Sequence, residues 1–421
     1  MQPKILTTLR SYSWPDFGAD ALAGVTVGLV ALPLSLAIAI ASGATPAQGL
    51  VTAIIGGFVV SALGGSRVQI GGPTGAFIVV VYAVVAEHGM AGLILATLMA
   101  GAILVVAGVL NAGRLVAFVP EPVIEGFTLG IAVIIATSQL RDFLGLDVAA
   151  LPADFLEKLP VLWAARDSFA WQAPFVGLAT MVLIVALRRF APPKVPGLIF
   201  AVVLGSALAL VPGLGVDTIG SRFGALPRSL PAPALPEMSL GLVRELLPSA
   251  LVIAFLAGVE SLLSAVVADR MIGGHHRHRA ELRAQGAANL ASALFGGLPV
   301  TGAIARTATN VKAGGRTPVA GIVHALTILL VMLVAAPLAG HLAMPAMAAL
   351  LMLTAWNMAE PGKWKGHVTG PRQDAFLIFL TMALTVLVDL TLAIGVGVAL
   401  GFALRRGRRA RPARDWTPRE K

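Results

Sequence analysis

Two short stretches rich in Gly, Pro and Thr interrupt an otherwise apolar chain. The first reads GGPTGAF (residues 71–77), and the second reads GLPVTGAIAR (residues 297–306). Proline suits the first turn of a helix, because its missing N–H would have no partner there. Each stretch therefore predicts an extended lead-in and the start of a helix, at a point where a membrane helix would be expected to continue.

The composition is typical of a membrane protein. Of the 421 residues, 57% are hydrophobic and 12% are charged, whereas soluble domains carry about 25% charged residues. The chain has no cysteine, which excludes disulfides, thiolate metal sites and cysteine nucleophiles. The polar N-terminus lacks the apolar core of a secretory signal, so the first apolar segment is expected to be retained.

Fourteen apolar segments can be counted, and the charges between them predict an orientation. The segments are expected near 21–43, 47–64, 73–86, 89–111, 120–139, 171–188, 195–212, 245–268, 282–297, 301–313, 317–336, 341–357, 373–388 and 389–404. With the N-terminus in the cytoplasm, the cytoplasmic side collects 24 of the 31 Lys and Arg residues and the outer side six, which leaves Arg306 inside a segment. Positive charge is enriched on the cytoplasmic side of membrane proteins. The sequence therefore predicts a multi-pass protein of the cell inner (plasma) membrane with both termini in the cytoplasm. Because the net charge of +10 is spread over loops and tail, no nucleic-acid partner is expected.

The sequence also matches itself after a shift of 227 residues, which lays TGAF of the first stretch on TGAI of the second and Pro33 on Glu260. Segments one to seven then correspond to segments eight to fourteen. Because seven is odd, the second set must enter the membrane from the opposite side, giving an inverted repeat of the kind found in secondary transporters. We therefore expect an all-α polytopic protein with this organisation: cytoplasmic N-terminus 1–20, first repeat 21–212, outer Pro-rich connection 213–244, second repeat 245–404 and basic cytoplasmic tail 405–421.

Segments three and ten, of about 13 residues each, fall short of the roughly 20 needed to cross a bilayer. Irregular backbone at that depth is tolerated only where it is buried or lines an aqueous cavity. We therefore expect two half-helices whose N-termini point at each other near the middle of the membrane. Each N-terminus carries about +0.5 charge and presents unpaired N–H groups, which bind anions.

Two ionisable residues are expected beside these helix starts. Arg306 lies four residues after Gly302, and helical side chains lean back towards the helix N-terminus. Placing an arginine in a membrane costs at least about 2.5–3.5 kcal/mol, which favours a role in substrate binding over a structural pairing with Glu260 or helix-end carbonyls. Glu260 is the only acid that the predicted topology places well inside the membrane region. Intramembrane acids commonly form proton relays, which favours ion coupling over a packing role for Glu260.

The chain resembles the sulfate permease (SulP) family of anion transporters over residues 10–404. The resemblance is carried by LPLSLAIAIASG (32–43), GGPTGAF (71–77), GVESLLSAVVAD (258–269), ELRAQGAANLASALFGGLPVTGAIARTATN (281–310) and GGRTPVAGI (314–322). It implies a core domain of segments 1–4 and 8–11, a gate domain of segments 5–7 and 12–14, and anion binding between the starts of segments three and ten. The implied pocket would hold Leu34, Ile38, Thr74, Gly75, Ala76, Thr301, Gly302, Ile304, Ala305 and Arg306.

The chain departs from the family pattern in two places. Family members usually continue into a cytoplasmic STAS domain, whereas this sequence ends in a basic tail, for which no folded domain is expected. Many relatives have Pro-Gln in segment one, where this chain has Pro33-Leu34. The pocket thereby loses a polar ligand, which favours a carboxylate among sulfate, bicarbonate, chloride, nitrate and small dicarboxylates.

The expected function is secondary active transport of a small anion, of the sulfate, bicarbonate or small dicarboxylate class, by alternating access. Symport with H⁺ is favoured over Na⁺, because no second acid is evident near Glu260. A nucleobase-type permease of the same fold and an anion channel or exchanger stay open, as does a homodimer through the gate or the missing cytoplasmic domain. The segments contain no paired carboxylates, metal-ligand motif or nucleophile–base pair, so we expect neither an enzyme nor a cofactor or metal site.

Overall fold

The computed structural model shows an almost entirely helical protein and describes residues 2–113, 120–192, 195–211, 213–388 and 390–405. Within these residues, seven helices are long and apolar enough to cross a membrane. They are Trp14–Ala41, Pro46–Leu63, Gly75–Val109, Glu121–Leu144, Gln172–Phe190, Leu240–Ile272 and Pro318–Ala339. Two shorter helices, Gly197–Leu210 and Leu392–Leu404, are also apolar. The protein is therefore an all-α, multi-pass membrane protein, as the sequence predicts.

The helices are distributed over both halves of the chain. The first half contains α1 (Lys4–Thr8), α2 (Trp14–Ala41), α3 (Pro46–Val51), α4 (Gly57–Leu63), α5 (Ile78–Val109), α7 (Glu121–Ser138), α8 (Leu140–Leu144), α9 (Phe155–Ala164), α10 (Gln172–Phe190), α11 (Gly197–Ala207) and α12 (Ile219–Phe223). The second half contains α13 (Leu240–Ile272), α14 (His278–Leu294), α15 (Ile304–Ala313), α16 (Pro318–Ala339), α17 (Met344–Met358), α18 (Trp364–Thr369), α19 (Arg372–Leu387) and α20 (Leu390–Arg405). A π-helical turn, Thr52–Gly56, joins α3 to α4, and a 3₁₀ turn, Gly75–Phe77, leads into α5.

A helix lies at each of the fourteen predicted segments. Predicted segments three and four are continuous in α5, where Gly89 has non-helical angles (φ 66°, ψ −173°) that divide it into 78–88 and 90–109. Helix α2 begins at Trp14, ahead of the predicted position 21, because Ser13 and Asp16 form a capping box there. The crossing of the bilayer by all fourteen helices, and their inverted repeat, stay predictions. The predicted tail lies almost wholly outside the described residues.

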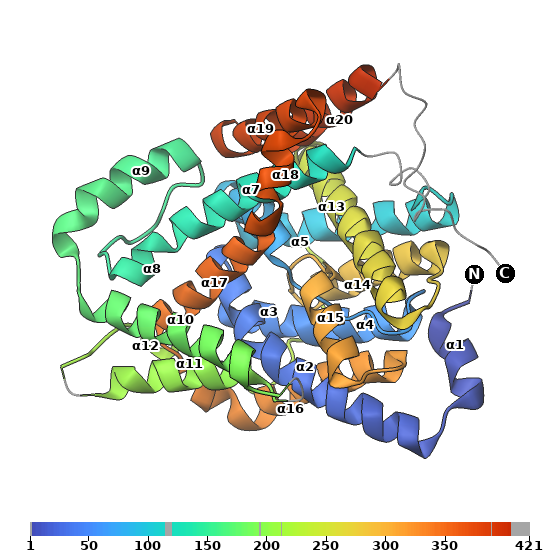
Figure 1. The fold of residues 1–421 in the computed structure, drawn as a ribbon, viewed down its shortest axis with the longest axis horizontal. Coiled ribbons are helices and arrows are strands. Elements are labelled where there is room, and N and C mark those ends of the chain that lie inside the picture. The colour runs from blue at the N-terminus through green and yellow to red at the C-terminus, as the bar shows by residue number, and fades with distance from the viewer. Residues whose placement is uncertain (1, 114–119, 193–194, 212, 389, 406–421) are drawn as a thin grey trace.

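The helices pack in two sets. In the first set α5 packs against α13 and α14, and α16 packs against α2 and α4; in the second set α7 packs against α17 and α19, and α10 packs against α11 and α17. The second set lies along the left and top of the molecule in Figure 1, and the first set fills the centre, bottom and right. Helix α2 also packs against α11 and α17 of the second set, and the division into a core and a gate domain stays a prediction.

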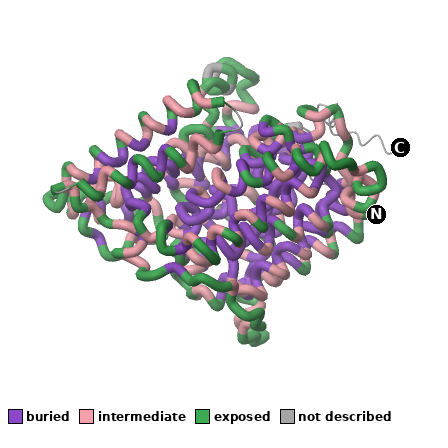
Figure 2. Tube along the Cα trace, turned by 90° about the horizontal axis from the view of Figure 1, so that it is seen from below, coloured by how far each residue is buried: buried purple, intermediate pink, exposed green. Residues whose placement is uncertain are grey.

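The surface of the helical bundle carries many apolar side chains. Buried residues concentrate in the middle of the molecule, and exposed residues surround them (Figure 2). Val182 on α10 is 66% exposed, and Leu330 and Val334 on α16 are 61% and 71% exposed. Large exposed apolar patches are rare on soluble monomers, so these faces are suited to contact lipid.

Two short strands bring the interrupted stretches of the two halves together. Strand β1 (Gly71–Gly72) pairs antiparallel with β2 (Thr301–Gly302), with Gly71 opposite Gly302 and Gly72 opposite Thr301. A helical turn follows each strand almost at once. Helix α15 has only 10 residues, which span about 15 Å at 1.5 Å per residue, or roughly half of a bilayer's hydrocarbon core.

Candidate functional site

The extended lead-in to β1 is held by polar side chains of α15. Thr307 accepts a hydrogen bond from the backbone N–H of Ile70 at 3.1 Å, and the Asn310 amide donates to the carbonyl of Val68 at 2.8 Å. Both side chains are fully buried. Because backbone groups at membrane depth have no water to bond with, these contacts allow the chain to stay extended inside the protein.

The lead-in to β2 is held in the same way. Asn289 of α14 donates to the carbonyl of Val300 at 2.8 Å and accepts from its N–H at 2.9 Å. The hydroxyl of Thr52, in the π-helical turn, accepts from the N–H of Leu298 at 2.7 Å. Side chains from other segments therefore hold both extended stretches, the one before β1 and the one before β2, in place.

A buried acid, Glu281, supports the loop before β1. Its Oε2 accepts from the backbone N–H groups of Gly65 at 2.8 Å and Ser66 at 3.2 Å, and its Oε1 accepts from Ser261 and Gln285, both at 2.9 Å. Glu281 is 0% exposed. The expectation that Glu260 is the only acid well inside the membrane region stays a prediction, because burial within the protein does not give a depth in the membrane. Glu281 is buried because backbone N–H groups from another part of the chain converge on its carboxylate.

Arg306 joins the two halves at the strand pair. Its side chain is 2% exposed, and its guanidinium donates to the carbonyls of Pro73 and, at 3.5 Å, Gly71. Gly72 lies between these two residues with φ 147°, and a Cβ there would overlap the Arg306 guanidinium. The arginine leans back towards the start of its helix, as expected, and there it contacts the backbone of the other half.

Glu260 meets the same stretch from another direction. The hydroxyl of Thr74 donates to Glu260 Oε2 at 2.9 Å, and Glu260 lies within the long helix α13. Among the described residues, the structure shows no ion pair between Glu260 and Arg306 within 4.0 Å. The acid and the arginine are thus connected through Pro73 and Thr74 rather than by a direct salt bridge.

The two helix starts lack side-chain caps. The N-cap residues are Thr74 for the 3₁₀ turn before α5 and Ala303 for α15, and neither side chain accepts a hydrogen bond from its own helix. Ile304, the first residue of α15, is 38% exposed, and Ala305 is exposed as well. The N–H groups of a helix's first turn have no partner within the helix, so an accessible anion can bind them.

The other predicted pocket residues differ in their surroundings. Leu34 is partly buried, and Ile38, on the same helix α2, is 1% exposed within the main apolar cluster. Thr301 is 0% exposed, and its hydroxyl donates to the carbonyl of Ala257 at 2.9 Å. Gly302 is buried, and a Cβ there would overlap the Gln69 side chain. Thr301 and Gly302 therefore hold the strand pair in place, behind the accessible helix start.

Two residues of the second helix set face the site and were missed from the sequence. A Cβ at Gly75 would lie 3.1 Å from Sδ of Met358 on α17 and 3.7 Å from Cδ1 of Ile135 on α7. Ala76, the next residue, is partly buried. Met358 and Ile135 lie in apolar segments that contain no local signal of a site. The boundary between the two helix sets therefore passes beside the start of segment three.

Comparison with known proteins gives the class of this protein. The sulfate permease family model matches residues 17–381. YvdB of Bacillus subtilis (strain 168) is 43% identical over 395 residues, which cover 93% of this chain and 74% of YvdB. The bicarbonate transporter BicA of Picosynechococcus sp. is 32% identical over 399 residues, which cover 91% of this chain and 69% of BicA. The chain belongs to the sulfate permease family, and it is an anion transporter of that family rather than an enzyme.

Solved structures agree with this assignment. The transmembrane domain of a cyanobacterial bicarbonate transporter BicA superposes with a TM-score of 0.81 at 33% sequence identity, covering 91% of this chain and 99% of that chain. Murine Slc26a9, an anion transporter in the inward-facing state, superposes with a TM-score of 0.85 at 17% identity, covering 96% of this chain and 70% of that chain. At this low sequence identity, the similarity to Slc26a9 shows the fold only.

Proposed function

We propose that this protein is a secondary active transporter that moves a small anion across the inner membrane by alternating access, in symport with protons. One observation carries the proposal. The start of segment three contacts Arg306 through Pro73 and Glu260 through Thr74, beside the uncapped and accessible start of α15. A cation, an acid and two helix N-termini thus share one small region.

The charges of this region favour an anion. Two helix N-termini contribute about +1 together, Arg306 adds one positive charge, and an ionised Glu260 removes one. The region therefore carries about +1 with Glu260 ionised and about +2 with Glu260 protonated. We propose that the anion site lies at the two helix starts, formed by Thr74, Gly75, Ala76, Ile304, Ala305 and Arg306 beside Leu34 and Ile38 of α2, and that Thr301 and Gly302 support it through the strand pair.

Relatives are named for sulfate or bicarbonate transport, and both anions fit a compact positive site. The apolar Leu34 offers no hydrogen bond to a substrate oxygen. A planar carboxylate such as bicarbonate needs fewer donors than the four oxygens of sulfate. We therefore propose a carboxylate substrate, bicarbonate or a small dicarboxylate, ahead of sulfate.

Glu260 is the proposed coupling residue. Its protonation removes a negative charge from the region and so strengthens anion binding, and linkage requires that the anion strengthen protonation equally. The Thr74 hydroxyl, bonded to Glu260 at one end of the proposed site, connects the proton site to the helix start. A single carboxylate is enough to carry a proton, which supports H⁺ ahead of Na⁺ as the coupling ion.

Alternating access requires one part of the protein to move against another. We propose that a core (segments 1–4 and 8–11) moves against a gate (segments 5–7 and 12–14), with Gly75 at their boundary, where an added Cβ would lie 3.1 Å from Met358. Inverted repeats are the usual basis of such motion in secondary transporters. We further propose that both termini are cytoplasmic, and that any homodimer forms through the gate or through a cytoplasmic domain.

An uptake panel in proteoliposomes tests this function. It would compare bicarbonate, sulfate, chloride, nitrate, a small dicarboxylate and uracil, each with an imposed pH or Na⁺ gradient. The proposal expects saturable anion uptake that an inward proton gradient drives. Uptake of uracil alone would indicate a nucleobase-type permease. Non-saturating ionic current would indicate a channel, obligatory dependence on a counter-anion would indicate an exchanger, and a response only to Na⁺ would replace H⁺ as the coupling ion.

A further inference from the structure

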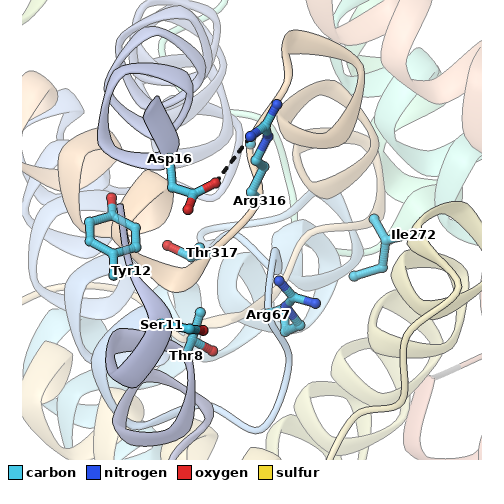
Figure 3. Close-up of a pocket in the computed structure, with 9 residues that line it drawn as sticks. Thr8, Ser11, Tyr12, Asp16, Arg67, Ile272, Arg316 and Thr317 are labelled. Carbon is cyan, nitrogen blue, oxygen red and sulfur yellow. Dashed lines mark hydrogen bonds and ion pairs between the residues drawn. The ribbon is translucent and has the colours of Figure 1, made fainter. Parts of the chain in front are cut away.

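A polar cavity of about 260 Å³ lies between the N-terminal segment and the loops that precede β1 and follow α15 (Figure 3). It shares no residue with the proposed transport site. Its walls are formed by Thr8, Ser11, Tyr12, Asp16, Arg67, Ile272, Gly315, Arg316 and Thr317.

The N-terminal segment is fixed to the loops around this cavity. The backbone N–H of Lys4 donates to the carbonyl of Gly64 at 2.8 Å, and its ammonium donates to the carbonyl of His275 at 2.9 Å. Arg277 donates to the carbonyl of Gln2 at 2.9 Å. Residues 2–4 are thus bonded to the loops at one end of the segment, and Asp16 is bonded to Arg316 at the other end, so the cavity is a preformed feature of the fold.

Three hydroxyl groups at the cavity are already committed within the protein. Tyr12 donates to Oδ2 of Asp20 at 3.1 Å, and Thr317 donates to the same oxygen at 2.5 Å. Thr8 donates to the carbonyl of Lys4 at 2.8 Å. A hydroxyl has one proton to donate, so none of these groups can donate to a ligand while these contacts persist.

Three other donors are available. The Arg67 side chain is exposed and makes no hydrogen bond or ion pair with any described residue, and the same holds for the Ser11 hydroxyl. Arg316 uses one nitrogen, Nη1, to contact Asp16 at 3.0 Å, and its side chain is 59% exposed. The three residues come from different segments around the opening (Figure 3). Two guanidinium groups and a hydroxyl thus border one cavity with unused N–H and O–H groups.

Positive charge is concentrated at this end of the protein. Burial lowers the pKa of Lys4, nearby Arg277 lowers it further, Asp269 raises it, and Arg67 again lowers it. Arg316 pairs with Asp16, and the carboxylate of Asp20 beside the cavity is bonded to Tyr12 and Thr317, whereas Arg67 has no ion pair with any described residue. A bound anion would relieve this repulsion.

The N-terminal segment also carries exposed apolar side chains. Leu6 and Leu9 are 52% and 47% exposed, and Trp14 is 84% exposed. Tryptophan is enriched where membrane meets water, and amphipathic segments of this kind lie in that interface. The cavity is therefore placed where either a lipid headgroup or a dissolved anion can enter it.

We propose that this cavity binds a phosphate group, held by the guanidinium groups of Arg67 and Arg316 and by the hydroxyl of Ser11. The planar guanidinium fork matches the oxygens of phosphate. Arg67 lies four residues before β1, and Arg316 lies three residues after α15 ends. A phosphate between them bridges the lead-in of segment three to the end of segment ten, and so stabilises the arrangement on which the transport site depends.

Thermal unfolding of the purified full chain in neutral detergent tests this site. The probes are inorganic phosphate, short-chain phosphatidylglycerol and short-chain phosphatidylcholine, titrated at constant ionic strength. We expect phosphate or phosphatidylglycerol, but not phosphatidylcholine, to raise the unfolding temperature saturably. Arg67→Gln should weaken this binding by about tenfold or more, since a charge-assisted bidentate contact is lost. Arg10→Gln, which removes an exposed basic residue of the same segment outside the cavity, should leave it unchanged.

Control variants distinguish binding at this cavity from binding elsewhere on the protein. Because phosphate could also enter the transport site, Arg306→Lys must retain the stabilisation. Stabilisation by phosphatidylglycerol alone assigns a lipid headgroup, and stabilisation by inorganic phosphate alone assigns a dissolved anion. The proposal is overturned if neither phosphate nor phosphatidylglycerol stabilises the protein. It is also overturned if Arg10→Gln weakens binding as much as Arg67→Gln does. The same holds if the stabilisation is lost in Arg306→Lys but retained in Arg67→Gln. If Arg67→Gln fails to fold, Arg67→Lys and Ser11→Ala replace it in the same binding test. Both variants change the contacts at the cavity with little change in charge.

Discussion

The hydroxyl of Thr74 donates to Oε2 of Glu260 at 2.9 Å. This contact joins the start of segment three to an acid in α13, 186 residues away in the sequence. A substrate held at that helix start and a proton held on that acid would therefore be neighbours.

For Glu260→Gln we expect loss of proton-driven accumulation with retention of anion exchange. The amide oxygen of glutamine can still accept from Thr74, whereas the amide cannot take up a proton near neutral pH. The measurement is anion uptake in proteoliposomes with and without an inward proton gradient, compared with counterflow of labelled anion. Full proton-driven accumulation by the variant would show that another group carries the proton.

Replacement of Arg306 should affect both binding and stability. Arg306→Ala removes one positive charge from the site and should weaken anion binding by about tenfold to a hundredfold, as expected for losing a charged partner. The carbonyls of Gly71 and Pro73 lose their donor as well, which should lower the free energy of unfolding by about 1–3 kcal/mol. Arg306→Lys keeps the charge without the planar fork and should be intermediate. A folded Arg306→Ala protein with unchanged anion affinity would make the arginine purely structural.

Gly72→Ala tests the position of the Arg306 side chain without removing its charge. The φ of 147° disfavours a side chain, and the new methyl group would displace the guanidinium. We expect weaker anion binding together with a lower unfolding temperature. Gly215→Ala is the matched control, because nothing lies within 4 Å of a Cβ there and its φ is not in the left-handed region. Equal behaviour of the two variants would contradict the proposed contact.

Glu281→Gln should destabilise the protein without removing the proposed coupling residue. The glutamine NH₂ would face groups that are themselves donors, leaving at least one of the four present hydrogen bonds unmade. The expected loss in the free energy of unfolding is about 1–3 kcal/mol, measured by denaturation in detergent. Glu237→Gln, at an exposed loop position, should change little. If Glu281→Gln lost proton coupling but kept its stability, the coupling residue would be Glu281 rather than Glu260.

Local sequence predicted the interruptions well. Gly and Pro at 71–73 disfavour a continuous helix whatever surrounds them, and β1 with its following turn lies there. The same reasoning located α15. Helix α2 begins earlier than expected. The polar residues of its first turns are bonded to distant segments: Asp20 accepts a hydrogen bond from the backbone N–H of Arg316, 296 residues later.

The partners across the molecule could not be predicted from local patterns. Glu281 lies between Arg279 and Arg283 and therefore looks like part of a charged loop. Its burial depends on the N–H groups of Gly65 and Ser66, more than 200 residues away in the sequence. Such a contact leaves no periodic signal along the chain, and neither do the hydrogen bonds from Arg306 to the carbonyls of Gly71 and Pro73.

Thiol labelling at the start of α15 tests the proposed anion site most directly. The chain contains no cysteine, so Ile304→Cys places a single thiol at the exposed first residue of that helix. We predict that a charged, membrane-impermeant thiol reagent labels this position and that a transported anion slows the labelling at concentrations that saturate transport. Gly215→Cys, at an exposed loop position, should label at the same rate with and without the anion. Labelling of Ile304→Cys that the transported anion does not slow would contradict binding at this helix start.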